Sequence, residues 1–193
     1  MNEMSIKLSS IDKKLDDISA TVTDYTCNVD ELQSEVVKLV LKVDDLENRS
    51  RRENLIVYGI KESVAENQQS LEQVVSKSIL ADTLKDPNVA IERIHRIGRP
   101  MEGRCQPVIY KLVAGRDKPN ILKNCKKLKG TAYSISEDFS QRIQLIRKKL
   151  WAAAAEHRKK GDKVMLSFDK IKINGKLFRW DGTEDKIVPL ASQ

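Results

Sequence analysis

The sequence predicts an α+β protein with three parts: an N-terminal parallel coiled coil over residues 1–50, a β-α-β-β-α-β domain over residues 51–135, and a small domain of one helix plus a β-hairpin over residues 136–193. Three features predict this organisation. Apolar residues repeat every 3.5 positions through the first fifty residues. Runs typical of strands and helices then alternate, and an Asn-Gly dipeptide separates two strand-like runs near the end.

The first fifty residues have the periodicity of a coiled coil. Their apolar residues follow at alternating spacings of 3 and 4, and no proline or glycine interrupts them. A repeat held over about six heptads is typical of helices that supercoil around one another. An amphipathic helix lying on its own globular domain would favour a broader stripe and a shorter helix. The predicted oligomerisation residues are Leu8, Ile11, Leu15, Ile18, Val22, Tyr25, Val29, Leu32, Val36, Leu39, Val43 and Leu46.

The residue types of this repeat leave the number of helices open. Valine at a with leucine at d in the C-terminal half favours two strands, whereas leucine at a with isoleucine at d near the start favours more. Lys42 and Glu47 stand in the g-to-e relation of parallel chains in register. Parallel packing would bring every copy of the sequence RSRR, at 49–52, to the same end of the coil.

Charge is divided unevenly along the chain. The formal net charge is +7, but residues 1–50 hold 6 Lys and Arg against 11 Asp and Glu, so the basic excess follows residue 50. A basic surface suggests a polyanionic partner. Three widely spaced cysteines and no secretory leader fit a reduced intracellular compartment, and no apolar run approaches the ~20 residues that cross a bilayer.

Metal and cofactor chemistry finds little support in the composition. Two histidines and no Cys-x-x-Cys pair leave a zinc site without ligands. We therefore expect no metal, no cofactor, no membrane partner and no small-molecule substrate.

The segment after the arginines predicts a compact mixed domain. Its order is the split βαβ arrangement that RNA-recognition motifs share. Strands are expected at 54–60, 89–98, 107–113 and 131–135, and helices at 70–80 and 117–130.

The aromatic residues that would stack bases are scarce in this domain. Ile56 occupies the position where RNA-recognition motifs usually show an aromatic, and Tyr58 on the same face is the candidate for stacking. Tyr110 falls with Val108 and Leu112, so we expect it in the core. Phosphate contacts should then outweigh base stacking, and sequence preference should be weak.

The last segment predicts a helix followed by a hairpin. Ser140 can cap a helix over 140–161 that has cations in its last turn and Gly161 at its end. Asn174-Gly175, between two runs of alternating apolar and polar residues in 163–181, is a type I′ hairpin signal. Nothing after Asp181 indicates an element.

In this order the parts resemble the first-open-reading-frame protein of LINE-type (non-LTR) retrotransposons, including the LINE-1 type transposase domain proteins. The resemblance covers nearly the whole chain. It is carried by NRSRRENLIVYGI at 48–60, IERIHRIGRP at 91–100, PVIYKL at 107–112, ISEDFS at 135–140, IRKKLW at 146–151 and KVMLSFDKIKINGKLFRWD at 163–181.

The resemblance implies a coiled-coil homotrimer that binds RNA and single-stranded DNA. Such a protein coats the element's RNA in a ribonucleoprotein particle and acts as a nucleic-acid chaperone. The particle would be cytoplasmic, with the nucleus as a second location. Because the C-terminal half of the seam favours two strands, a dimer stays open beside the trimer.

The resemblance also implies which cations bind nucleic acid. They are Arg49, Arg51 and Arg52 near the end of the coil, Arg96, Lys111, Lys123 and Lys126 in the middle domain, and Arg147 with Lys148 where the family has an Arg-Arg pair. Lysine lacks the planar fork, so a bidentate phosphate grip is in doubt at position 148. Further cations of the same segments complete the predicted set: Arg93, Arg99, Arg104, Lys127 and Arg142.

Two other classes of function compete with this one. A coiled-coil structural or adaptor protein would recruit its partner by the rod, and the basic region would only keep it soluble. An enzyme would need carboxylates arranged around a metal ion, or a nucleophile with a base. Glu137 and Asp138 are adjacent, a spacing that gives no paired acid–base geometry, so we predict no catalytic residue.

Overall fold

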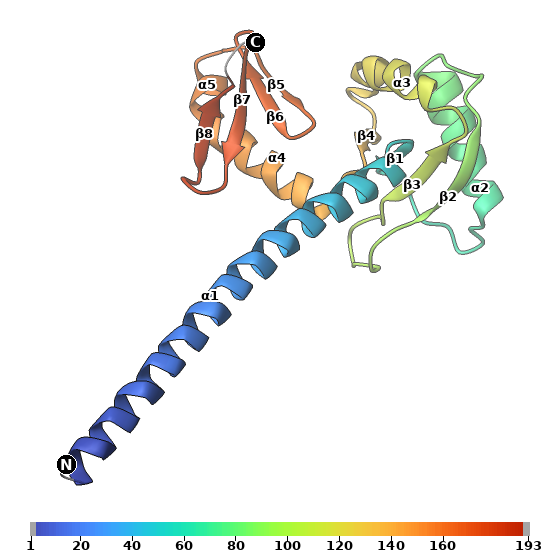
Figure 1. Ribbon diagram of the computed structural model, residues 1–193. Helices are drawn as coiled ribbons and strands as arrows, with labels where there is room; N and C mark the ends of the chain where they lie inside the picture. The colour runs from blue at the N-terminus through green and yellow to red at the C-terminus, as the bar shows by residue number, and fades with distance from the viewer. Residues whose placement is uncertain (1–2, 191–193) are drawn as a thin grey trace. The chain divides into compact units, whose positions relative to one another are not determined.

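A computed structural model gives the structure of the chain and describes residues 3–190. The protein is mixed α+β, with a long N-terminal helix and two antiparallel four-stranded sheets, which confirms the predicted fold class at this level (Figure 1). The chain divides into two compact units, Met1–Leu46 and Glu47–Gln193. Both sheets belong to the second unit.

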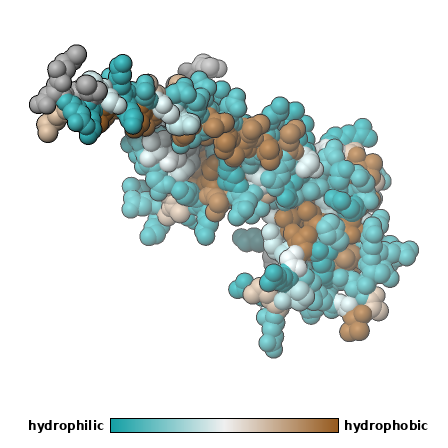
Figure 2. All heavy atoms as spheres, turned by 60° about the horizontal axis from the view of Figure 1, so that its bottom comes forward, coloured by the Kyte–Doolittle hydropathy of each residue, from teal (hydrophilic) through white to brown (hydrophobic). Residues whose placement is uncertain are grey.

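Helix α1 (Glu3–Ser50) carries the heptad repeat. All twelve predicted seam residues lie on it, and each exposes between 48% and 65% of its surface. Val37, Val40 and Leu41 add further exposed apolar side chains near its C-terminal end. Figure 2 shows apolar side chains (brown) open on the surface among hydrophilic ones (teal). A row of this length on one helix is the kind of surface that another protein surface covers.

The first sheet has the strand order β2-β3-β1-β4, and all neighbouring strands are antiparallel. Its elements follow along the chain in the expected order β-α-β-β-α-β. The strands are β1 (Asn54–Tyr58), β2 (Ile91–Arg96), β3 (Val108–Leu112) and β4 (Ser134–Glu137). The first helical segment is α2 (Gln68–Gln73) with the π-helix η1 (Val74–Thr83), and the second is η2 (Gly115–Asp117), α3 (Lys118–Asn124) and η3 (Cys125–Leu128).

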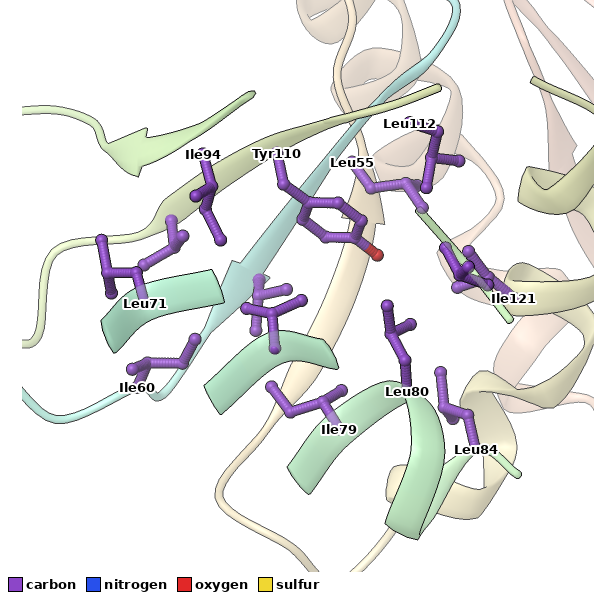
Figure 3. Packing of buried hydrophobic residues seen from close by; sticks show 14 of the residues in the cluster. Leu55, Ile60, Leu71, Ile79, Leu80, Leu84, Ile94, Tyr110, Leu112 and Ile121 are labelled. Atoms are coloured by element: carbon purple, nitrogen blue, oxygen red, sulfur yellow. The ribbon is translucent and has the colours of Figure 1, made fainter. Parts of the chain in front are cut away.

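One face of this sheet packs against both helical segments. Leu55 on β1 and Tyr110 on β3 are fully buried, and the residues between such positions point to the other face. Figure 3 shows them packed with Ile79 from η1 and Ile121 from α3. Tyr110 is therefore a core residue, as predicted. Its buried hydroxyl has no hydrogen-bond partner among the described residues, and burial raises its pKa.

The helix predicted at 70–80 widens after its first turns. It starts with a capping box in which the side chains of Asn67 and Ser70 bond each other's backbone N–H groups. The following segment is π-helical, and at its end the backbone N–H of Leu84 donates to the carbonyl of Ile79, five residues earlier, at 2.9 Å. Such i to i−5 bonding is rare over ten residues, and the 3.6-residue pattern did not predict it.

The second sheet is a meander with the order β5-β6-β7-β8. Leu150 and Ala154 pack against Ile171 and Ile173 to form its small core. The hydroxyl of Ser140 accepts a hydrogen bond from the backbone N–H of Ile143, which confirms the predicted cap. The elements are α4 (Gln141–Ala153), α5 (Ala155–Lys159), β5 (Val164–Ser167), β6 (Lys170–Ile173), β7 (Lys176–Asp181) and β8 (Lys186–Pro189).

The prediction of one helix plus one hairpin is incomplete for this region. The helix breaks at Ala154, and the guanidinium of Arg158 donates to the carbonyl of Trp151, left without its helical partner. Asn174 and Gly175 both have positive φ, as a type I′ turn requires. The turn before β6 was missed because Phe168, an unusual residue at positive φ, forms it.

The last strand was missed as well. β8 is short, lies at the edge of the sheet and ends at Pro189. Proline is tolerated in a sheet only at such places, and it lowers the strand signal of the sequence.

Candidate nucleic-acid interface

The face of the first sheet turned away from its helices gathers three of the predicted site residues. Tyr58 lies on β1 with 41% of its surface exposed, and the Ser136 hydroxyl donates to its hydroxyl at 3.5 Å. Arg93 on β2 stands opposite Lys111 on β3 in the strand register. Ile56 lies between these groups and is buried, so the face has no aromatic in its middle.

His95 also lies on this face, although it is not among the predicted site residues. It is exposed on β2 and pairs in register with Ile109, which in turn pairs with Ile56. A histidine ring is flat and can stack on a base. Ile94 and His95 alternate apolar and polar, as expected for a strand with one buried face, and Ile94 is indeed buried. The apolar residues of 89–98 fall three apart, however, so this alternation was not recognised.

Lys111 is compensated by two acids. Its Nζ lies 2.7 Å from Oε2 of Glu92 and 3.9 Å from Oε2 of Glu53. The register between β2 and β3 shifts between Ile91 and Arg93, so the bulge falls at Glu92. Arg93 itself is exposed and forms no ion pair with the described residues.

Arg96 is used inside the fold. Its guanidinium donates to both oxygens of Glu66 at 2.6 Å and to the carbonyls of Ile60, Lys61 and Gln106, so all five N–H groups are engaged. Only 9% of the side chain is exposed, and the hydrogen bonds that Arg96 donates to Glu66 raise the pKa of Arg96. This geometry favours a structural role over the predicted contact with nucleic acid.

Arg51 closes a second internal cluster. Its Nη1 donates to both oxygens of Asp138 at 2.9 Å, and its Nε donates to Oε1 of Glu47 at 3.0 Å. Asn54 donates to the same Asp138 carboxylate at 3.0 Å. Burial lowers the pKa of Arg51, but the hydrogen bonds and charges of Asp138 and Glu47 outweigh it, so the pKa is raised.

The other arginines of the RSRR segment are differently placed. Arg49 is exposed on the last turn of α1. Arg52 is exposed just before β1, and its side chain makes no hydrogen bond or ion pair within residues 3–190. The cluster at 49–52 is therefore divided: Arg51 joins parts of the fold, and Arg52 is open to a ligand.

The loop between β2 and β3 presents two further cations. Arg99 and Arg104 are exposed, and neither is ion-paired in the described part of the chain. The backbone N–H of Arg104 donates to the carbonyl of Met101, which closes a tight turn. Since β2 ends and β3 begins here, and Val57 pairs with Val108, this loop lies at the end of the sheet where Tyr58 lies.

The predicted cations of the second helical segment lie elsewhere. Ile121 and Leu128 bury one side of this segment on the helical face of the sheet, opposite the face of Tyr58. Lys127 donates to the carbonyl of Leu84 at 2.9 Å. Lys123 and Lys126 are exposed without a side-chain partner among the described residues, so the structure does not bring them together with Tyr58, Arg93 or Lys111.

Arg147 and Lys148 also differ in their contacts. The guanidinium of Arg147 lies 4.4 Å from the centre of the Phe139 ring and donates to the carbonyl of Phe168 at 2.8 Å. Burial lowers its pKa. Lys148 is exposed and has no ion pair within the described range. Arg142 is exposed one turn earlier on α4.

The comparisons with known proteins give no family for this chain. No protein-family model matches it, and no curated protein sequence is significantly similar to it. In residues 3–190 no helix is both long and apolar enough to cross a membrane. The same residues contain no group of three or more His, Cys, Asp or Glu side chains placed to hold a metal ion.

Proposed function

We propose that the chain is a non-enzymatic, oligomeric protein that binds single-stranded RNA and DNA with little sequence preference. The observation that carries this proposal is an open sheet face edged by exposed arginines without acidic partners: Arg93 on the face, Arg52 at one end of it, and Arg99 with Arg104 at the other. Unpaired cations of this kind bind phosphates irrespective of base sequence.

The topology of the first sheet supports an RNA-recognition-like domain. Its order β2-β3-β1-β4, with the helical segments on one face, is that of the split βαβ fold. RNA-recognition motifs bind bases on the opposite face. Here that face offers Tyr58 and His95 as flat rings, at its end and its edge strand, so we infer one or two stacked bases and a larger share of phosphate contacts.

The exposed seam of α1 supports assembly through a parallel coiled coil. Twelve large apolar residues at heptad spacing lie open on this helix, and the partner that would cover them best is the same seam of another copy. A trimer follows from the resemblance to LINE proteins, and a dimer from the C-terminal half of the seam. Sedimentation equilibrium on the full chain distinguishes the two masses.

The contacts of Glu137 and Asp138 favour a non-enzymatic role, because both carboxylates are already paired within the fold. Asp138 is occupied by Arg51 and Asn54, and Oε1 of Glu137 lies 3.3 Å from Nζ of Lys118. Both acids therefore serve the fold. By resemblance, the bound nucleic acid would be the RNA of a LINE-type element, coated in a cytoplasmic or nuclear ribonucleoprotein particle, and the protein would act as its chaperone.

A structural or adaptor role is the second candidate. It is favoured by Val37, Val40 and Leu41, which lie outside the a and d positions and are about half exposed. A rod with such an outer patch can hold a protein partner instead of serving only its own assembly.

Filter binding tests the proposed function. We expect the full chain to bind an RNA of about 40 bases, with affinity that falls steeply with salt and changes little between sequences. The variant Arg52→Gln/Arg99→Gln/Arg104→Gln should bind more weakly, and Lys123→Gln/Lys126→Gln/Lys129→Gln, with the same charge change on the helical face, is its matched control. No binding by the wild type at low salt would refute the proposal, and equal losses in both variants would refute the assigned face.

A further inference from the structure

The second sheet has an uncovered face of its own, and its outward side chains are basic. Ile171 and Ile173 on β6 are buried toward α4, so Lys170 and Lys172 point to the opposite face. Arg179 on β7 stands directly opposite Lys170 in the register. Lysines and arginines that are scattered along the sequence thus meet on one surface.

Lys170, Lys172 and Arg179 form no ion pair in the described part of the chain. The nearest acid along β7 is Asp181, whose Oδ1 accepts hydrogen bonds from the backbone N–H groups of Thr183 and Glu184 at 2.9 and 3.2 Å. These hydrogen bonds, and then the charges of Arg179 and Lys186, lower the pKa of Asp181, so this one acid offsets only part of the positive charge of the face. Like charges directly opposite each other on neighbouring strands destabilise a sheet. The face therefore holds an electrostatic repulsion that a bound polyanion would relieve.

We propose that this face, defined by Lys170, Lys172 and Arg179, is a second contact surface for the sugar–phosphate backbone of a single strand. The proposal rests on the function proposed above and adds a site to it. The face carries no aromatic side chain: its apolar members in register with the lysines are Met165 and Leu177. Contacts there are therefore with phosphate rather than with stacked bases, and they add affinity without sequence preference.

Lys176 belongs to the same hairpin but does not lie on this face. It pairs in register with the buried Ile173, so it lies off the row of Lys170 and Arg179. It therefore provides a control within the same sheet. Lys159 and Lys160, at the end of α5, are exposed and likewise lie off the face.

The test compares two triple variants of equal charge in the full chain. Lys170→Gln/Lys172→Gln/Arg179→Gln should bind a 40-base single-stranded RNA roughly 10- to 50-fold more weakly at about 0.15 M salt, and the slope of log K against log salt should become shallower by about 2, since each phosphate contact contributes about 0.7. Lys159→Gln/Lys160→Gln/Lys176→Gln should change affinity by less than about threefold. Thermal unfolding of the first variant should occur at the wild-type temperature or above, because a repulsion has been removed.

The outcomes separate this inference from the proposed function. If the wild type binds RNA but the slope of log K against log salt changes no more in the face variant than in the control, the inference is overturned and the proposed function stands. A wild type that does not bind RNA overturns both. If the triple variant does not fold, the single variants Lys172→Gln and Arg179→Gln replace it in the binding experiment. For each, the slope of log K against log salt should become shallower by about 0.7. An unchanged slope in both would contradict the proposal.

Discussion

The two sheets treat a lysine–arginine pair in opposite ways. In the first sheet Arg93 stands opposite Lys111, and two glutamates flank the lysine. In the second sheet Arg179 stands opposite Lys170, and no acid within residues 3–190 is ion-paired with either.

This difference shows that the number of cations says little about binding. Arg96 and Arg51 use their donors within the fold, whereas Lys172 and Arg52 use none of theirs among the described residues. Where acids accompany the cations, the charge stabilises the protein; where they are absent, it is available to a polyanion.

Removal of the Arg96 side chain should cause the largest loss of stability among these variants. We expect Arg96→Ala to lower the free energy of unfolding by about 3 kcal/mol or more, because Glu66 and three carbonyls lose their donors. Urea titration measures the loss, and Arg99→Ala, an exposed arginine three residues on, is the control. An Arg96→Ala protein of wild-type stability would contradict the internal role assigned to this residue.

A smaller loss should follow at Arg51. Because a third of its side chain is exposed, we expect Arg51→Ala to cost about 2 kcal/mol of folding free energy. Arg51→Lys should recover only part of this loss, since arginine uses Nη1 for Asp138 and Nε for Glu47, whereas lysine has a single nitrogen. The same urea titration measures both. Full recovery by lysine would show that charge alone matters at this site.

The second sheet should respond in the other direction. Lys170→Gln removes a like-charge contact with Arg179, so its stability should stay equal or rise by about 0.5 kcal/mol. Thermal unfolding at low salt is the most sensitive measurement, because salt screens the repulsion. A clear destabilisation would mean that Lys170 has an acidic partner after all.

The smallest effect concerns Asp162, which lies between α5 and β5. Hydrogen bonds from Asn174 and then His157 lower the pKa of Asp162 below its ordinary value of 3.8. A lowered folded-state pKa contributes stability that is present above pH 3.8 and is lost as the pH falls through the folded pKa. Asp162→Asn should therefore unfold at a slightly lower temperature than the wild type at pH 6, and the two unfolding temperatures should become equal in strong acid. A constant difference down to pH 2 would contradict this linkage.

Local sequence patterns predicted helices, strands and core residues, but they did not predict which charged side chains form contacts within the fold. The heptad spacing predicted α1, and the alternation around Tyr110 placed that residue in the core. The role of Arg96 was not predictable, because its acceptors come from residues 60, 61, 66 and 106, which only the fold brings together. The same holds for the pairing of Lys170 with Arg179, since it required the strands to be placed first.

The position of β1 sets an order of events during synthesis. β1 is made first of its sheet but lies between β3 and β4, so it lacks its first neighbour until residues 108–112 have been translated and its second until residues 134–137 have been translated. The partner of Arg51, Asp138, emerges one residue later. α1 needs only its own backbone bonds, and at about 5–20 residues per second it precedes the sheet by several seconds. In the proposed coiled coil, chains translated side by side from one messenger can therefore join by their rods before either sheet exists.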